Sequence, residues 1–158
     1  MKVESWSKLL FSVIVCNVAG VIGSIFTTPN ITTWYATLVK PSFVPPNWVF
    51  APVWTTLFIM MGVSFYFVWE KEKFSRECNR CLKVFTAQLV LNILWSVLFF
   101  GAKNLAAAFV EIIILWIFIA YTIRLFWNVD RRSGYLLMPY IAWVSFAALL
   151  NLSLWLLN

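Results

Sequence analysis

Carboxamide and aromatic side chains at helical spacing are the residues of this sequence best suited to chemistry. Gln88, Asn92, Trp95 and Phe99 follow an i, i+4, i+7, i+11 pattern, which places them on one face of a helix. An amide group within an apolar helix needs a hydrogen-bond partner, because hydrocarbon offers none. We therefore expect this stripe to face the interior of a helix bundle.

A second stripe lies near the C-terminus, where Trp143, Ala147 and Asn151 follow an i, i+4, i+8 pattern. Like the first, it combines a large aromatic residue with a carboxamide, and it adds a small residue. Two interpretations stay open for the two stripes. One is interhelical hydrogen bonding with aromatic core packing, and the other is a ligand cavity with aromatic walls and a few orienting polar groups.

Glu111 is the only acidic residue deep within an apolar stretch. If this stretch spans a membrane as a helix, a rise of 1.5 Å per residue places Glu111 roughly 10 Å from the nearer membrane boundary. Asn92 would lie at a similar depth. Intramembrane carboxylates are functional candidates. The alternative is a protonated Glu111 that forms a hydrogen bond with a neighbouring helix.

The rest of the sequence offers no conventional catalytic residues. It has no histidine, which removes the usual general base and the usual axial ligand of haem iron. It also has no G-x-S-x-G, no P-loop and no pair of carboxylates within one apolar stretch. Catalytic residues therefore stay unassigned.

The three cysteines predict no metal site. Cys16 lies in an apolar stretch and is expected to be a small packing residue. Cys78 and Cys81 form a C-x-x-C, but one such pair lacks the four ligands of a structural zinc site and should be reduced inside a cell. We favour an exposed loop over a redox or metal role for this pair.

Membrane-spanning helices are the elements that must position these residues. The chain is 63% hydrophobic and 11% charged, whereas soluble domains carry about 25% charged residues. A spanning helix needs about 20 mostly apolar residues, and five such runs are present: residues 9–26, 48–69, 84–102, 104–123 and 135–157. Continuous apolar runs of this kind argue against the alternating pattern of a β-barrel. The sequence therefore predicts an all-α polytopic membrane protein, in which residues 1–158 form a single bundle of five transmembrane helices.

Lysine and arginine are distributed unequally between the two sides of the predicted bundle. The side of the N-terminus carries Lys2, Lys8, Lys71, Lys73, Arg76, Arg80, Lys83, Arg124, Arg131 and Arg132. The opposite side carries only Lys40 and Lys103. The positive-inside rule then predicts a cytoplasmic N-terminus. The net charge of +6 reflects this topology and anionic lipid headgroups, and we expect no binding to nucleic acid.

One connection is long. Five of the six prolines lie between residues 29 and 52, and residues 27–47 form the connection, in which Trp34, Tyr35 and Phe43 make the segment too apolar for a flexible linker. Loops of this length without regular structure are usually functional or disordered. We expect a lid loop between the first two helices that folds back over the bundle.

Three shorter features also carry predictions. Residues 70–83 alternate between acidic and basic side chains, and this pattern predicts a solvated extension of a helix. Pro139 should kink the last helix, because it deletes one backbone hydrogen bond. The first helix carries two small-xxx-small pairs, which allow either close packing within the chain or a dimer face. These pairs are Ala19 with Gly23 and Gly20 with Ser24.

Three blocks of the sequence resemble a known family. Residues 34–54 read WYATLVKPSFVPPNWVFAPVW, residues 88–103 read QLVLNILWSVLFFGAK, and residues 139–151 read PYIAWVSFAALLN. The first block resembles the signature of the tryptophan-rich sensory protein/translocator protein family, also called TspO/MBR or the peripheral benzodiazepine receptor family. The match is collinear over almost the whole chain.

The resemblance implies five helices and a ligand cavity capped by the first long loop. It also implies binding of porphyrins such as protoporphyrin IX, of haem-like tetrapyrroles and, in some members, of sterols. Family members are commonly dimers, so a homodimer is expected. The implied pocket positions are Trp34, Tyr35, Trp54, Asn92, Trp95, Trp143 and Ala147. Phe99, on the same helical face as Asn92 and Trp95, completes the predicted ligand site.

Two departures from the family pattern narrow these expectations. Animal members often have histidines in the lid, whereas residues 43–47 read FVPPN here, which argues against haem ligation by the loop. The sterol-recognition pattern expected after the last helix is missing, and only a degenerate match exists at Leu115, Tyr121 and Arg124. Sterol transport is therefore disfavoured.

The leading hypothesis is a membrane receptor or sensor that binds a tetrapyrrole in an aromatic cavity. No resident cofactor is expected. The alternatives are an enzyme that degrades porphyrin in the light, which needs no acid or base, and a carrier of tetrapyrrole-like or sterol-like molecules. We expect a multi-pass protein of a prokaryotic plasma membrane.

Overall fold

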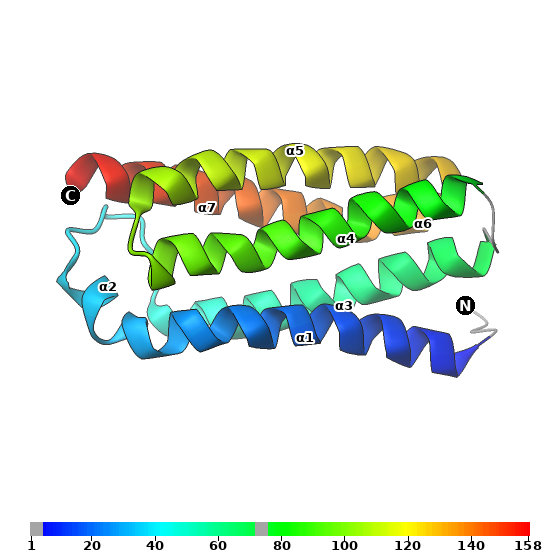
Figure 1. The fold of residues 1–158 in the computed structure, drawn as a ribbon, viewed down its shortest axis with the longest axis horizontal. Coiled ribbons are helices and arrows are strands. Elements are labelled where there is room, and N and C mark those ends of the chain that lie inside the picture. Colours follow the sequence, from blue (N-terminus) through cyan, green and yellow to red (C-terminus); the bar gives the residue numbers. More distant parts are fainter. Residues whose placement is uncertain (1–4, 72–75) are drawn as a thin grey trace.

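A computed structural model describes residues 5–71 and 76–158, except for the side chains of residues 76–78. Every regular element in this part of the chain is a helix (Figure 1). The elements are α1 (Trp6–Ile31), α2 (Trp34–Thr37), α3 (Asn47–Lys71), α4 (Arg76–Ser96), the π-helix η1 (Val97–Gly101), α5 (Leu105–Val129), α6 (Arg131–Leu136) and α7 (Met138–Leu157). The predicted all-α fold is confirmed.

Among the described residues, five helical stretches are long and apolar enough to cross a bilayer, and they make the chain a multi-pass integral membrane protein. These stretches are Trp6–Ile31, Asn47–Lys71, Asn79–Gly101, Leu105–Val129 and Arg131–Leu157. They run up and down in one bundle, with the start of α1 and the C-terminus at opposite ends (Figure 1). We call the end with residues 32–46, residues 102–104 and the C-terminus the loop end. The other end, where α1 begins, α3 ends and α5 meets α6, is the basic end.

The first helix is longer than predicted, and the connection after it is correspondingly shorter. The predicted lid loop covered residues 27–47, but α1 continues to Ile31 and α2 forms a further helical turn. Pro29 removes one backbone donor from the last turn of α1. Side chains add hydrogen bonds to other carbonyls in this part of α1, since Asn30 Nδ2 donates to Phe26 O (2.9 Å) and Thr27 Oγ1 donates to Gly23 O (3.1 Å).

The third spanning segment differs from the prediction in length and in helix type. It was predicted as residues 84–102, but α4 begins at Arg76 and its last turn is the π-helix η1. A π-helical turn inserts one extra residue and shifts the register of the side chains that follow. In this turn the neighbours Phe99 and Phe100 are both buried.

The last span consists of two helical segments rather than one. A single helix over residues 135–157 was predicted, but α6 and α7 are separate segments that meet at Leu137. Pro139 lies in the first turn of α7, where its missing N–H costs no hydrogen bond. The fourth span also continues beyond the predicted residue 123 to Val129.

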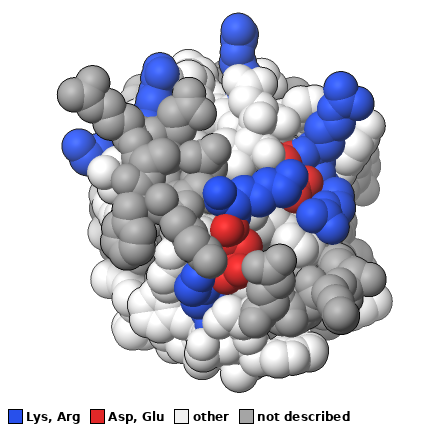
Figure 2. Space-filling view, turned by 90° about the vertical axis from the view of Figure 1, so that its right-hand side faces the viewer, with Lys and Arg blue, Asp and Glu red and all other residues white. Residues whose placement is uncertain are grey.

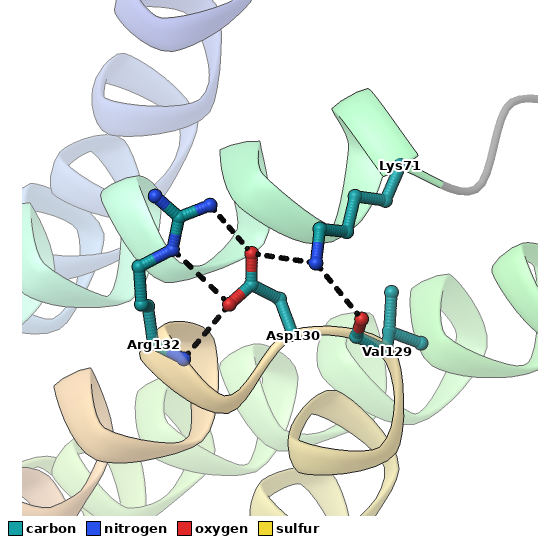
Figure 3. Close-up of polar contacts among 4 residues, drawn as sticks. All are labelled: Lys71, Val129, Asp130 and Arg132. Carbon is teal, nitrogen blue, oxygen red and sulfur yellow. Dashed lines mark hydrogen bonds and ion pairs between the residues drawn. The ribbon is translucent and has the colours of Figure 1, made fainter. Parts of the chain in front are cut away.

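An ion-pair cluster ties the basic end together (Figure 3). The buried Asp130 carboxylate lies 2.9 Å from Arg132 Nη2 and 3.2 Å from Lys71 Nζ, so it joins α3 to the α5–α6 junction. Its Oδ1 also accepts the Arg132 backbone N–H at 2.8 Å, which caps α6. Burial raises the pKa of Asp130, but hydrogen bonds from Arg132 and Lys71 outweigh it and lower that pKa to about 2. Figure 2 shows this end of the molecule, where Lys and Arg surround the acidic side chains.

The C-x-x-C pair does not lie in an exposed loop as predicted. Cys81 lies in α4, because that helix begins five residues before it, and its side chain is buried. The side chain of Cys78 lies outside the described residues, as do residues 72–75 of the predicted solvated extension.

Candidate functional site

A cavity of about 370 Å³ lies within the loop-end half of the bundle. Its walls come from α1, α3, α4 with η1, and α7, and α2 contributes Tyr35. This volume is within the range of small-molecule sites. The residues that line the cavity from α3 to α7 are Asn47, Phe50, Ala51, Trp54, Thr55, Phe58, Asn92, Trp95, Ser96, Phe99, Phe100, Trp143, Ala147, Leu150, Asn151 and Leu154.

Seven of the eight residues predicted as the ligand site line this one cavity. They are Tyr35, Trp54, Asn92, Trp95, Phe99, Trp143 and Ala147. Trp34 does not line it. The indole of Trp34 packs instead behind the wall, edge-on against Phe99 (5.7 Å between ring centroids) and Phe100 (6.4 Å).

A carboxamide fixes the orientation of Trp95 in the cavity wall. Asn151 Oδ1 accepts the indole N–H of Trp95 at 3.1 Å, and Asn151 Nδ2 donates to Leu105 O at 2.9 Å. The ring of Trp95 in turn stacks on Phe99, with ring centroids 4.9 Å apart. Asn151 thus connects α4, α5 and α7 while leaving the indole face available to the cavity.

Asn92 has a similar double role. Its Nδ2 donates to the buried hydroxyl of Tyr140 at 3.0 Å, and the Tyr140 ring packs edge-on against Trp54. No described residue donates a hydrogen bond to Asn92 Oδ1. Asn92 therefore positions one aromatic wall and keeps an acceptor for a ligand.

Trp143 is held differently from Trp95. Its ring packs against Phe50 (5.9 Å) and Phe146 (5.5 Å), but its buried indole N–H has no hydrogen-bond partner among the described residues. Trp143 also borders a shallow apolar groove between α3 and α7 on the outside of the bundle. It therefore forms a thin wall between the cavity and the molecular surface.

The connection between α1 and α3 covers the loop end of the cavity. Tyr35 is only 5% exposed and packs against Phe99 and Phe100, with ring centroids 6.3 and 5.9 Å away. Asn158 binds the same connection further along, because its side chain accepts the Val39 N–H (2.9 Å) and donates to the Val39 carbonyl (3.1 Å). These contacts hold residues 34–39 against the bundle.

The wall contributed by α1 was not predicted. Its cavity-lining residues are Asn17, Gly20, Val21, Gly23, Ser24, Thr27, Thr28 and Ile31. The small-xxx-small pairs were the available signal, but they were interpreted as a packing or dimer surface. Within the chain, Ala19 and Gly23 are buried, and a Cβ at Gly20 would lie 2.5 Å from the Phe58 ring.

Two other predicted residues lie outside the cavity lining. Gln88, one turn before Asn92, is fully buried but lies too far toward the basic end. Glu111 is 5% exposed, and neither of its carboxylate oxygens has a hydrogen-bond partner among the described residues. The hydrogen bond predicted between Glu111 and a neighbouring helix is therefore not formed.

The lining of the cavity is largely apolar. No Asp, Glu, Lys, Arg, His or Cys of the described chain lines it. Several lining hydroxyls donate to the backbone of their own helix, as in Ser24 to Val21 O and Thr55 to Ala51 O, and so present little polarity. Aromatic faces and a few amide groups are left for recognition.

Comparison with known proteins places the whole chain in one family. The model of the TspO/MBR family matches residues 12–156. The tryptophan-rich protein TspO of Chlorobaculum tepidum is 45% identical over 147 residues, which cover 90% of both chains. The translocator protein of Ovis aries is 36% identical over 151 residues (95% of this chain and 89% of that protein). The tryptophan-rich sensory protein of Cereibacter sphaeroides is 32% identical over 153 residues (97% and 92%). The chain therefore belongs to the TspO/MBR family.

Proposed function

We propose that this protein is a membrane receptor or sensor that binds porphyrins, such as protoporphyrin IX, and similar hydrophobic molecules in the cavity. The observation that carries the proposal is the position of Trp54, Trp95 and Trp143 around one cavity without charged residues. A receptor or sensor role in general is supported by the relatives, which include a tryptophan-rich sensory protein and a translocator protein.

Aromatic stacking would supply much of the affinity. An aromatic pair contributes roughly 0.5–1.5 kcal/mol beyond the burial of apolar area. The indole face of Trp95 is pre-oriented by Asn151, so little side-chain entropy is lost when a macrocycle stacks on it. Asn92 Oδ1 would accept a pyrrole N–H of a metal-free porphyrin.

The cavity lining favours recognition of the macrocycle over ligation of iron. No His, Cys or Met of the described chain lines the cavity, and these residues are common axial ligands of haem iron. The carboxylates of a porphyrin would lie toward the loop end, where Lys40 Nζ is 4.8 Å from the centre of the Tyr35 ring. That lysine sits outside the cavity, next to water.

Titration of the purified protein in nanodiscs with protoporphyrin IX tests the proposal. Porphyrin absorbance reports binding without relying on the tryptophans that are removed. The double variant Trp95→Ala, Trp143→Ala should weaken the affinity by about tenfold or more, because two stacking faces are lost. Trp116→Ala is the matched control, since Trp116 is 38% exposed and does not line the cavity. Unchanged affinity in the double variant would contradict the proposal.

Light-dependent degradation of porphyrin is a second candidate function. It is supported by the presence of three oxidisable indoles in the cavity wall. A bound porphyrin absorbs light and passes the excitation energy to dioxygen, which then oxidises the macrocycle. The test is to illuminate the porphyrin complex in air and to follow the Soret band. Bleaching no faster than that of porphyrin in empty nanodiscs would exclude this activity.

A carrier function has less support from the structure. The degenerate sterol pattern at Leu115, Tyr121 and Arg124 does not form a surface, because Leu115 is only 1% exposed. Tyr121 is also engaged, since its hydroxyl accepts a hydrogen bond from Arg80. Porphyrin flux across proteoliposomes would be needed to support transport.

A further inference from the structure

The connection between α1 and α3 covers only part of the cavity at the loop end. Tyr35 is buried against η1, and both backbone groups of Val39 are bound by the side chain of Asn158. Thr28 and Asn47, near the helix ends, line the cavity and are exposed. The exposed part of the lining shows where a ligand can enter.

The contact between α1 and α3 is tight only in the basic half of the bundle. A Cβ at Gly62 would lie 2.5 Å from the backbone Cα of Val13, so the two helices touch there. Further along, at Gly20, the nearest neighbour is the side chain of Phe58 rather than the backbone. A side chain therefore lies between the two helices at this point.

Six cavity-lining residues beyond this point are also exposed on the outer surface of the bundle, and all of them lie on α1 or α3. Val21 is 63% exposed, and the others are Ser24, Thr28, Asn47, Ala51 and Thr55. The cavity is therefore open between α1 and α3. Thr28 and Asn47 lie near the helix ends, and we define the α1–α3 gap by the other four residues.

The α1–α3 gap faces hydrocarbon and not water. Thr55 lies eight residues after the start of α3, which corresponds to about 12 Å along the helix axis. Val21 lies ten residues before the end of α1, or about 15 Å. Both positions are well within spanning segments.

The chemistry of the gap matches this position. Ser24 Oγ donates to Val21 O at 2.7 Å, and Thr55 Oγ1 donates to Ala51 O at 2.9 Å. Both hydroxyl donors are thus satisfied within their own helices, and an apolar molecule passing them displaces no hydrogen bond.

We propose that the α1–α3 gap is a lateral portal through which a hydrophobic ligand enters the cavity from the bilayer leaflet at the loop end. The proposal rests on the proposed function, because it assumes that the cavity binds a membrane-soluble molecule. It adds the route of entry, and it makes the bilayer the source of the ligand. A flat apolar molecule concentrates in the membrane before it binds.

Binding kinetics of protoporphyrin IX in nanodiscs test the portal. Ser24→Trp and Thr55→Trp add bulk at the gap, and each should slow both association and dissociation by about tenfold, whereas loss of cavity space alone would speed dissociation. Ile25→Trp and Ile59→Trp are matched controls, because these residues are lipid-exposed on the same helices but do not line the cavity. Unchanged rates in both gap variants, with normal binding in the wild type, would overturn the portal and leave the proposed function intact.

The Asn158→Ala variant distinguishes the two routes. It removes both hydrogen bonds to Val39 and so loosens the cover at the loop end. Entry through the gap predicts an unchanged association rate. A clear increase in that rate would show that ligands pass the loop and would overturn the portal.

A measurement without porphyrin keeps the portal testable if the proposed function fails. The wild-type protein is placed in nanodiscs that contain a fatty acid with a photoreactive diazirine in its chain. The sample is irradiated, and the labelled residues are mapped by mass spectrometry. Labels on Asn92, Trp95 or Phe99, reduced in Ser24→Trp, are expected if hydrocarbon reaches the cavity through the gap. Labels confined to lipid-exposed residues would overturn the portal, whatever the outcome of the porphyrin titration.

Discussion

The two halves of this bundle are built from the same helices but are held together in different ways. In the basic half, α1 and α3 touch through Gly62 and Val13, and the rings of Phe65, Phe85 and Phe126 stack at centroid distances of 4.9 and 5.5 Å. In the loop-end half, the same pair of helices borders a cavity of about 370 Å³.

Polar contacts differ between the halves in the same way. At the basic end, Asp130 joins α3 to the α5–α6 junction through ion pairs, and Ser64 Oγ donates to Ser133 O at 2.8 Å to tie α3 to α6. In the loop-end half, Asn92 donates a hydrogen bond to Tyr140, which packs against the cavity-lining ring of Trp54. Asn151 accepts the indole N–H of Trp95, which itself lines the cavity. Polar groups stabilise the fold at one end and position the candidate site at the other.

This difference shows how a membrane bundle can contain a cavity. Lipid chains are as apolar as the side chains, so helices in a bilayer associate through close packing and polar contacts. Packing that is given up around a cavity must be compensated elsewhere in the chain. We infer that the basic half supplies that stability, and three predictions test this division.

The largest effect is expected from Gly62→Ala. Its Cβ would meet the Val13 backbone at 2.5 Å, which no change of side-chain rotamer can relieve. Overpacking of this kind costs about 1–3 kcal/mol, and it should lower the unfolding temperature in detergent. Gly101→Ala, near the loop end, is the control, because its Cβ would meet only the Phe26 ring at 3.1 Å. Equal loss of stability in the two variants would contradict the division.

An intermediate effect is expected from Asp130→Asn. Asparagine keeps the helix cap but loses the charge that pairs with Arg132 and Lys71, at a cost of roughly 1–2 kcal/mol, since both partners are partly exposed. The pKa of Asp130 is lowered to about 2 from an ordinary value of 3.8, so its stabilising effect is fully present above about pH 4. The effect should be lost as the pH falls from 4 toward 2.

Chemical denaturation in detergent at several pH values checks this prediction. The difference in unfolding free energy between wild type and Asp130→Asn should be constant from pH 5 to 7 and should shrink below pH 4. A difference that does not change down to pH 2 would show that the carboxylate charge contributes nothing to folding.

The smallest effect is expected from Asn151→Ala. This change leaves the Trp95 N–H and the Leu105 carbonyl without their partner, and it frees the indole ring to rotate. We expect the affinity for protoporphyrin IX to fall about fivefold, or about 1 kcal/mol. Ser145→Ala is the control, because it removes the hydrogen bond of Trp116, an indole on the outside of the bundle (2.8 Å). An equal effect of the two changes on affinity would argue against a positioning role for Asn151.

The sequence predicted more of the candidate site than of the helix boundaries. Helical periodicity in the spans placed Asn92, Trp95 and Trp143 on inward faces, because a buried amide or indole N–H is costly unless it finds a partner. The family resemblance added Tyr35 and Trp54. Periodicity could not show that α1 forms a wall, since small residues are compatible with helix packing, with a dimer face and with a cavity.

Local irregularities were missed for a different reason. The π-helical turn at Val97–Gly101 and the break at Leu137 depend on which hydrogen bonds the surrounding helices allow. The pattern of apolar residues is nearly the same for an α-helix and a π-helix over five residues. Cys81 was placed in a loop because charged neighbours hid the start of α4.

Composition and periodicity alone determined that this chain crosses a membrane five times, because each of its five apolar runs is long enough to span a bilayer as a helix. They also determined which faces of two helices turn inward. Only the tertiary structure decided that α1 and α3 touch at one level and border a cavity at another. The reason is physical: helix packing depends on contacts between residues far apart in the chain, such as Gly62 with Val13 and Gly20 with Phe58.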